Sequence, residues 1–145
     1  RNMKITCGII LEKLNGQILL CHPTNSSKDS WSIPKGLNED LEDFWETAKR
    51  ELLEETSIDL DQFDYTMEEV PQLFIYKNKK KCLKAFWVKL NDDKIDQVKL
   101  ECKSLVDNDF PEVDKFMWTS PEEALKLMHQ TQIEAIQAGI FPDFG

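Results

Sequence analysis

The sequence predicts a single α/β domain, which could equally be classed as α+β, with helices packed on a mixed sheet. Residues 5–14 are rich in β-branched and apolar side chains and end at Asn15-Gly16, the strongest short signal for a hairpin. Residues 17–21 then form the returning strand. A strong helix signal follows at Asp43, and strand and helix patterns alternate to the end of the chain, without repeats or linkers.

Composition limits the class of protein. A chain of 145 residues with 41% hydrophobic residues is long enough to bury the core of one domain. Its 27 acidic residues outnumber the 18 basic ones and give a formal net charge of -9. An acidic surface argues against nonspecific binding to duplex nucleic acid or to an anionic membrane, which needs clustered lysine and arginine. A phosphate-containing substrate stays compatible with this charge if a metal ion neutralises it.

The cysteines and the chain ends carry weaker information. The four cysteines contain no CxxC pair and are interpreted as reduced thiols of a cytoplasmic protein. No apolar run is long enough to span a membrane. We expect one domain over residues 3–140 and a C-terminal tail over residues 141–145. Residues 1–2 are interpreted as a remnant of cloning.

Each later element has a local signal. Asp43 and Glu46 form a capping box that begins a helix over residues 43–56. Residues 72–76 and 82–90 are predicted to pair around the lysine-rich turn at 77–81. The remaining predictions are short strands at 98–102 and 115–118, a helix at 121–128 and a helix at 130–137 that ends at Gly139.

Three carboxylates share one face of the predicted helix. On a helical wheel, Glu51, Glu54 and Glu55 fall within an arc of about 100°. Like charges at this spacing repel one another, so a partly buried face of this kind needs a cation. Mg²⁺ is the natural candidate because it prefers oxygen ligands and binds carboxylates together with substrate phosphates. A solvated glutamate-rich face is the alternative for this segment alone.

The surroundings of that face resemble the signature of the Nudix hydrolase family, G-x5-E-x7-R-E-U-x-E-E-x-G-U, where U is aliphatic. Ser57 stands where the family has a glycine that would end the helix in the left-handed conformation. The Trp31 to Gly36 segment, with its PKG sequence, is similar to the diadenosine tetraphosphate hydrolase branch. The resemblance implies an α/β/α sandwich with a mixed central sheet. The matching positions are Gly36, Glu42, Arg50, Glu51, Leu52, Glu54, Glu55 and Ile58.

The resemblance also implies chemistry: hydrolysis of a nucleoside diphosphate linked to another moiety, with Mg²⁺ or Mn²⁺ as cofactor. Glu51, Glu54 and Glu55 would bind the metal, and Glu54 is favoured as the group that accepts the proton of the attacking water. Arg50 would orient the carboxylates by ion pairing, and Glu42 would support them. A further catalytic carboxylate from a distant loop is expected at Glu112, with Asp109 and Glu101 as the next candidates.

Substrate identity is the least determined part of the prediction. Lys35, Gly36, Trp31 and Tyr76 are candidate substrate-binding residues, and Tyr76 lies 18 residues after Ile58, a spacing similar to that of dinucleoside polyphosphate hydrolases. A dinucleoside polyphosphate such as diadenosine tri- or tetraphosphate is therefore favoured. ADP-ribose, FAD or an RNA 5′ end are alternative substrates, and a non-catalytic nucleotide-binding module is an alternative function. The oligomeric state, monomer or homodimer, is left open.

Overall fold

Strand β1 lies at the centre of the sheet that organises the chain. The structure, a computed structural model, describes residues 3–106 and 109–140. The strand order is β4-β5-β1-β2-β8, with β3 paired to β1, and the β1–β5 pair is parallel whereas the others are antiparallel. The strands are β1 (Lys4–Glu12), β2 (Ile18–Pro23), β3 (Lys35–Leu37), β4 (Tyr65–Ile75), β5 (Lys81–Leu90), β6 (Leu105–Val106), β7 (Phe110–Pro111) and β8 (Val113–Thr119).

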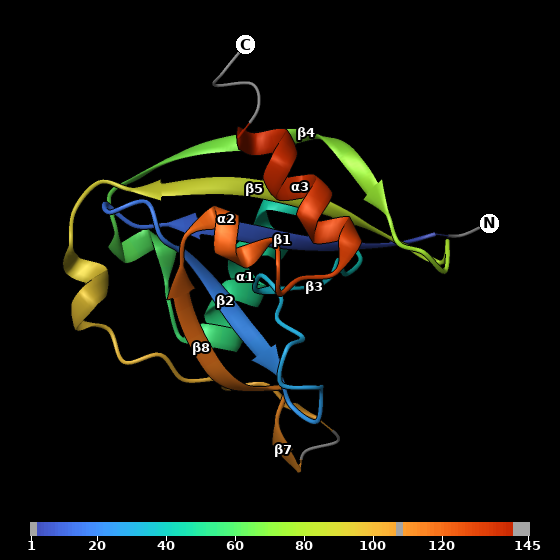
Figure 1. Cartoon of the computed structure of the whole chain (residues 1–145), viewed down its shortest axis with the longest axis horizontal. Coiled ribbons are helices and arrows are strands. Elements are labelled where there is room, and N and C mark those ends of the chain that lie inside the picture. Colours follow the sequence, from blue (N-terminus) through green and yellow to red (C-terminus); the bar gives the residue numbers. More distant parts are fainter. Residues whose placement is uncertain (1–2, 107–108, 141–145) are drawn as a thin grey trace.

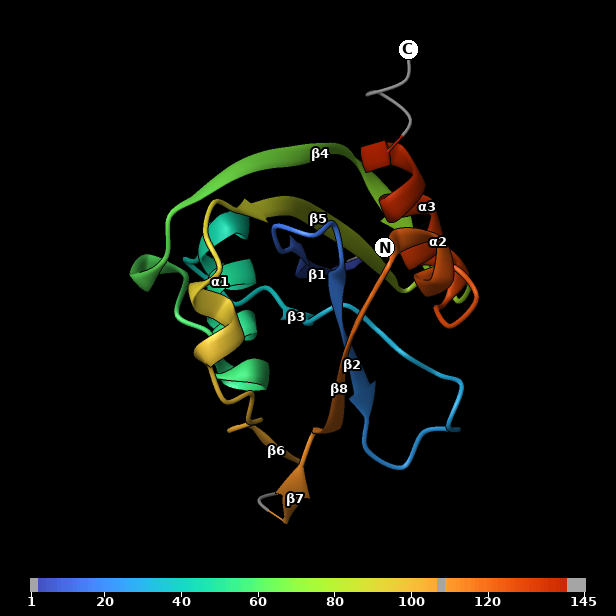
Figure 2. The same cartoon turned by 60° about the vertical axis from the view of Figure 1, so that its left-hand side comes forward.

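Helices cover both faces of this sheet, as the sequence predicts. Figure 2 shows α1 (Phe44–Thr56) on one side and α2 (Pro121–Ala124) with α3 (Gln130–Ile140) on the other. Two short 3₁₀ turns, Leu60–Gln62 and Lys94–Gln97, lie in the connections. The prediction of an α/β/α sandwich with a mixed central sheet is therefore confirmed (Figure 1).

The two-residue period of β1 explains why the sheet can carry helices on both faces. Cys7, Ile9 and Leu11 belong to the core beneath α1, whereas Ile10 belongs to the core beneath α2 and α3. All four side chains are fully buried. Because successive side chains point to opposite faces, a strand that is apolar on both faces must lie inside the sheet.

Helix α1 begins and ends as its sequence predicts. The Asp43 side chain accepts a hydrogen bond from the Glu46 amide, and the Glu46 side chain accepts one from the Asp43 amide, which completes the capping box. Ser57 follows the helix in the left-handed conformation, with φ 72° and ψ 11°. The serine therefore adopts the backbone shape expected of the glycine that it replaces.

The predicted strand at residues 98–102 is wrong. This segment is irregular because its backbone pairs with the end of α1 and not with a strand: the Glu101 amide donates to the Thr56 carbonyl at 3.1 Å. Strand β4, in contrast, extends well beyond the predicted residues 72–76. It contains a bulge between Glu69 and Leu73, where the buried Lys84 ammonium donates to the Val70 carbonyl at 3.0 Å and pairs with Glu69.

The C-terminal helices also differ from the prediction. Helix α2 ends at Ala124 and not at residue 128, because the chain tightens and the Leu127 carbonyl accepts a hydrogen bond from the Trp31 amide at 2.9 Å. Helix α3 continues through Gly139, which was predicted to end it. A Cβ at Gly139 would lie 2.4 Å from the Trp87 ring, so this glycine allows a helix to pack closely against the sheet. The predicted segments 1–2 and 141–145 lie outside the described residues.

Candidate active site

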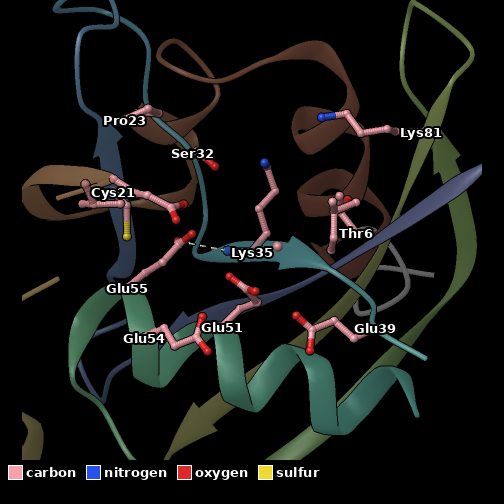
Figure 3. Close-up of a pocket in the computed structure, with 14 residues that line it drawn as sticks. Thr6, Cys21, Pro23, Ser32, Lys35, Glu39, Glu51, Glu54, Glu55 and Lys81 are labelled. Carbon is pink, nitrogen blue, oxygen red and sulfur yellow. Dashed lines mark hydrogen bonds between the residues drawn. The ribbon is translucent and has the colours of Figure 1, made fainter. Parts of the chain in front are cut away.

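A cavity of about 380 Å³ lies above the C-terminal half of α1 (Figure 3). Five glutamates from three parts of the chain line it: Glu51, Glu54 and Glu55 from α1, Glu39 from the loop after β3, and Glu112 from the loop before β8. Lys35, Gly36 and Leu37 of β3, together with Thr6, Lys81, Cys21, Pro23, Ser32 and Val113, complete the lining.

Arg50 links the carboxylates of the signature. Its guanidinium donates to both oxygens of Glu42, from Nε at 2.7 Å and from Nη2 at 3.1 Å. Nη1 donates to Oε2 of Glu51 at 3.0 Å and to Oε2 of Glu54 at 3.1 Å. The pKa of Glu42 is lowered to about 2, mainly by the hydrogen bonds from Arg50. Glu46, one helical turn before Arg50, is instead occupied in the capping box.

Gly36 is needed for the position of Glu51. A Cβ built on Gly36 would lie 2.0 Å from Cδ of Glu51, so any side chain here would displace that carboxylate. The neighbouring Lys35 amide donates to Oε1 of Glu55 at 3.3 Å. Strand β3 therefore sets two carboxylates of α1 through its backbone alone, which explains the glycine of the signature in physical terms.

Burial and mutual repulsion raise the pKa values of two carboxylates of the cluster, Glu51 and Glu55. The pKa of Glu55 is raised to about 8, first by burial and next by the charge of Glu51. The pKa of Glu51 is raised to about 7, first by burial and next by the charge of Glu54. Glu112 adds to both effects, which places its charge within reach of the cluster. The positive charges of Arg50 and Lys35 therefore do not offset the burial and mutual repulsion of these carboxylates.

The donor set therefore fits a hard divalent cation. Its ligands would be carboxylate oxygens, and Arg50 leaves Oε1 of Glu51 and of Glu54 outside its hydrogen bonds. Over residues 3–106 and 109–140, no group of three or more potential ligands already converges as a complete site. In this arrangement Arg50 bridges Glu51 and Glu54, and the Lys35 amide binds Glu55.

Glu112 reaches the cavity from a loop that is distant in sequence. Its amide donates to the Ser104 carbonyl at 3.0 Å, and its carbonyl accepts from the Thr24 amide at 2.9 Å. Both bonds fix the backbone at the point where the chain enters β8. Glu101 and Asp109, the other candidates for a distant carboxylate, lie outside the cavity lining of the described chain.

The candidate substrate-binding residues divide into two groups. Lys35 and Gly36 line the cavity, whereas Trp31 and Tyr76 lie outside the lining formed by the described residues. The Trp31 indole donates to the Lys28 carbonyl at 3.0 Å, and its ring packs against His22, which is a structural setting. Tyr76 lies beside the cavity, because Nζ of Lys81 is 5.3 Å from its ring centroid and its hydroxyl is 3.5 Å from Oγ1 of Thr6.

Sequence reasoning did not single out Lys81 or Thr6. Lys81 was included only as the end of a lysine-rich turn, yet its side chain is half-buried whereas those of Lys79 and Lys80 are exposed. The available signal was position: Lys81 begins β5 and pairs with Lys4, at the start of the strand that carries Thr6. Without the parallel pairing of β1 and β5, that signal could not be interpreted.

Comparison with solved structures supports the fold. The chain is similar to a C. elegans Ap4A hydrolase in a binary complex, with a TM-score of 0.71 and 23% identity, covering 98% of this chain and 97% of that one. It is similar to E. coli dihydroneopterin triphosphate pyrophosphohydrolase with a TM-score of 0.73 and 16% identity, covering 98% and 99%. The NUDIX domain of Shewanella oneidensis NrtR complexed with ADP ribose gives a TM-score of 0.71 at 13% identity, covering 96% of this chain and 87% of that one.

Sequence comparison identifies the family. The model of the NUDIX domain matches residues 3–144, and the chain belongs to this family. Over 51 residues it is 41% identical to "Nucleoside diphosphate-linked moiety X motif 6" of Xenopus laevis, a match that covers 35% of this chain and 24% of that protein. Every carboxylate of the family signature is present in the chain, and hydrolases of this family use divalent metal ions. The described residues contain no helix long and apolar enough to cross a membrane.

Proposed function

We propose that this protein hydrolyses a dinucleoside polyphosphate, such as diadenosine tri- or tetraphosphate, with Mg²⁺ or Mn²⁺ bound to Glu51, Glu54 and Glu55. The observation that carries the proposal is the distribution of charge in the cavity. Carboxylates line it near α1, Lys35 extends into it from β3 beside these carboxylates, and Lys81 lies on the side away from α1 (Figure 3). A polyphosphate chain can contact the metal at one end of such a cavity and ammonium groups at the other.

The roles of the side chains follow from their contacts. The metal, when bound, would polarise phosphoryl oxygens and lower the pKa of a bound water. Glu54 is the least constrained of the three α1 carboxylates, with a side chain 40% exposed, so it can accept the proton of the attacking water. Glu112 approaches from the opposite loop and offers a second acceptor, and Arg50 keeps Glu51 and Glu54 in place.

The second nucleoside would lie beside Tyr76. The Tyr76 ring packs against His129 with 5.6 Å between ring centroids, and it borders Thr6 and Lys81, which line the cavity. An aromatic ring beside the Lys81 side of the cavity suits a nucleobase separated from the cleaved bond by several phosphates. This arrangement supports a dinucleoside polyphosphate over a substrate with one short diphosphate.

ADP-ribose is the second candidate substrate. It is favoured by one observation: a NUDIX domain of similar fold has been solved with ADP ribose bound. A diphosphate substrate would use the carboxylates and Lys35 but would leave Lys81 without a phosphate partner.

The test is product analysis of a substrate panel. Purified protein with Mg²⁺, and separately with Mn²⁺, is incubated with diadenosine tri- and tetraphosphate, ADP-ribose, FAD, nucleoside triphosphates and a triphosphorylated RNA, and products are separated by ion-pair chromatography. We expect selective cleavage of the diadenosine compounds, which falls to baseline in EDTA. Selective cleavage of ADP-ribose or FAD would replace the proposed substrate, undiminished activity in EDTA would contradict the metal mechanism, and no cleavage with either metal would favour a binding module.

A further inference from the structure

Ser57 is the position at which this chain departs from its family signature, and its side chain makes a bond that glycine could not make. The residue holds a left-handed backbone, with φ 72°, which is unfavourable for any residue with a Cβ. Its hydroxyl donates to the Glu101 carbonyl at 2.6 Å. This short hydrogen bond joins two residues that are 44 positions apart in the sequence, so the serine does more than end the helix.

The bond holds one end of a segment that runs along the C-terminal turn of α1. Residues 101–104 contact α1 at three points: Ser57 Oγ donates to the Glu101 carbonyl, the Glu101 amide donates to the Thr56 carbonyl, and the Lys103 amide donates to the Glu54 carbonyl at 2.7 Å. The last carbonyls of a helix have no donor within the helix, so they are available to fix a neighbouring segment. This segment is therefore held against the same turn that carries Glu54 and Glu55.

The same segment supports Glu112. The Ser104 carbonyl accepts the hydrogen bond of the Glu112 amide at 3.0 Å, and the adjacent pair of Leu105 with Pro111 extends this contact. The carboxylate of Glu112 then lines the cavity with Glu51 and Glu55. The Ser57 hydroxyl and the backbone of Glu112 are thus bonded to opposite ends of one short segment, residues 101–104.

We propose that Ser57 is a positioning residue: its hydroxyl fixes the 101–104 segment against α1 and thereby sets the place of Glu112 at the cavity. The inference rests on the proposed function in one respect, namely that Glu112 takes part in hydrolysis. Its structural half, the fixing of the segment, is independent of any substrate.

Two substitutions separate the hydroxyl from the backbone conformation. Ser57→Ala and Ser57→Gly both remove the hydrogen bond, but only glycine relieves the left-handed backbone. We expect both variants to lower kcat by about three- to tenfold with little change in KM, because a displaced carboxylate slows the chemical step. The Tm of Ser57→Gly should exceed that of Ser57→Ala. A kcat that follows the order of Tm, or a Ser57→Gly variant with wild-type kcat, would overturn the proposal.

A double substitution tests whether Ser57 acts through Glu112. In a Glu112→Gln background, Ser57→Ala should have no further effect on kcat, because the group that it positions is no longer present. An undiminished loss in that background would overturn the proposal. Thr66→Ala, which removes an exposed hydroxyl from the edge strand β4, is the matched control and should keep wild-type kcat in both backgrounds.

Amide hydrogen exchange provides the readout that needs no substrate. In Ser57→Ala, the amides of Lys103 and Glu112 should exchange at least about tenfold faster, while the amide of Ile10 in β1 keeps its rate. Unchanged exchange at Lys103 and Glu112 would overturn the inference whatever the activity. Faster exchange in a protein whose wild type cleaves nothing in the panel would contradict the proposed function and leave the fixing of the segment supported.

Discussion

The two ends of the cavity are held in place to different degrees. At the α1 end, Arg50 makes hydrogen bonds to three glutamates. The Glu51 carboxylate also packs so closely against Gly36 that any side chain at position 36 would displace it. At the far end, the Tyr76 amide donates to the Lys81 carbonyl at 2.9 Å, but the two side chains meet only through a ring contact of 5.3 Å. Under the proposed function, rigid local geometry would specify the hydrolytic chemistry, and a few adaptable side chains at a strand end would determine the choice of substrate.

The strongest test of this contrast is Glu54→Gln. The change keeps the size of the side chain but removes a charge that the proposed metal site and the proton transfer both need, so kcat should fall about 100-fold or more. Activity is measured with the preferred substrate of the panel, and circular dichroism checks the fold. Glu134→Gln, which removes an equal charge from an exposed position of α3, is the control. Near-wild-type turnover by Glu54→Gln would contradict the site assignment.

Gly36→Ala tests the rigidity of the α1 end. The new methyl group would occupy the place of the Glu51 carboxylate, so we expect kcat to fall by about ten- to 100-fold and the Tm to fall as well. Adding Glu51→Ala to this variant should restore the Tm without restoring activity. A Gly36→Ala protein with wild-type Tm would show that the carboxylate moves freely, against the contrast drawn above.

Glu42→Gln should affect stability in a pH-dependent way. The pKa of Glu42 is lowered from 4.5 to about 2, so its ionised form stabilises the folded state. That contribution is complete above the ordinary pKa and is lost as the pH falls toward about 2, because the unfolded chain takes up the proton first. At pH 7 the variant should melt a few degrees below wild type, and the gap should close toward pH 2. A gap that stays constant with pH, measured by thermal melts, would contradict this role.

The smallest effect is expected at the far end. Lys81→Gln should raise KM for the diadenosine substrate about three- to tenfold and leave kcat nearly unchanged, since this contact binds ground state and transition state alike. Lys80→Gln removes the same charge from an exposed neighbour and should leave KM unaltered. Equal effects of the two substitutions would assign the change to net charge, and a large loss of kcat in Lys81→Gln would place this lysine with the rigid end.

The sequence predicted the α1 end well because its determinants are local. Asp43 and Glu46 cap the helix across three residues, and the signature fixes the spacing of Gly36, Arg50 and the glutamates. Each of these features depends on contacts within one helix and the loop that precedes it. The pattern left the shape of the turn at Ser57 open, because a serine is unfavourable in the left-handed conformation that it adopts.

The parts that escaped prediction depend on contacts between distant segments. Residues 98–102 carry apolar residues like a strand, but the Glu101 amide donates to the end of α1 and the Val98 amide donates to the Ile95 carbonyl. Gly139 was predicted to end a helix, yet it lies within one, and its lack of a side chain leaves room for the Trp87 ring. Lys81 reaches the cavity only because β5 pairs with β1 in parallel, and no local sequence pattern predicts that pairing. The substrate end was less predictable for the same reason.

The central position of β1 has a consequence for folding. This strand pairs with β2 across a short turn but with β5 across more than half of the chain, and Thr6 and Lys81 line the same cavity only after that second pairing forms. Closing a loop of this length is entropically costly, so the parallel pair should form late on the folding pathway. A nascent chain that has emerged only through residue 58 contains the whole signature but lacks Lys81 and Glu112. The cavity is therefore complete only when the chain closes on itself, long after the signature has been synthesised.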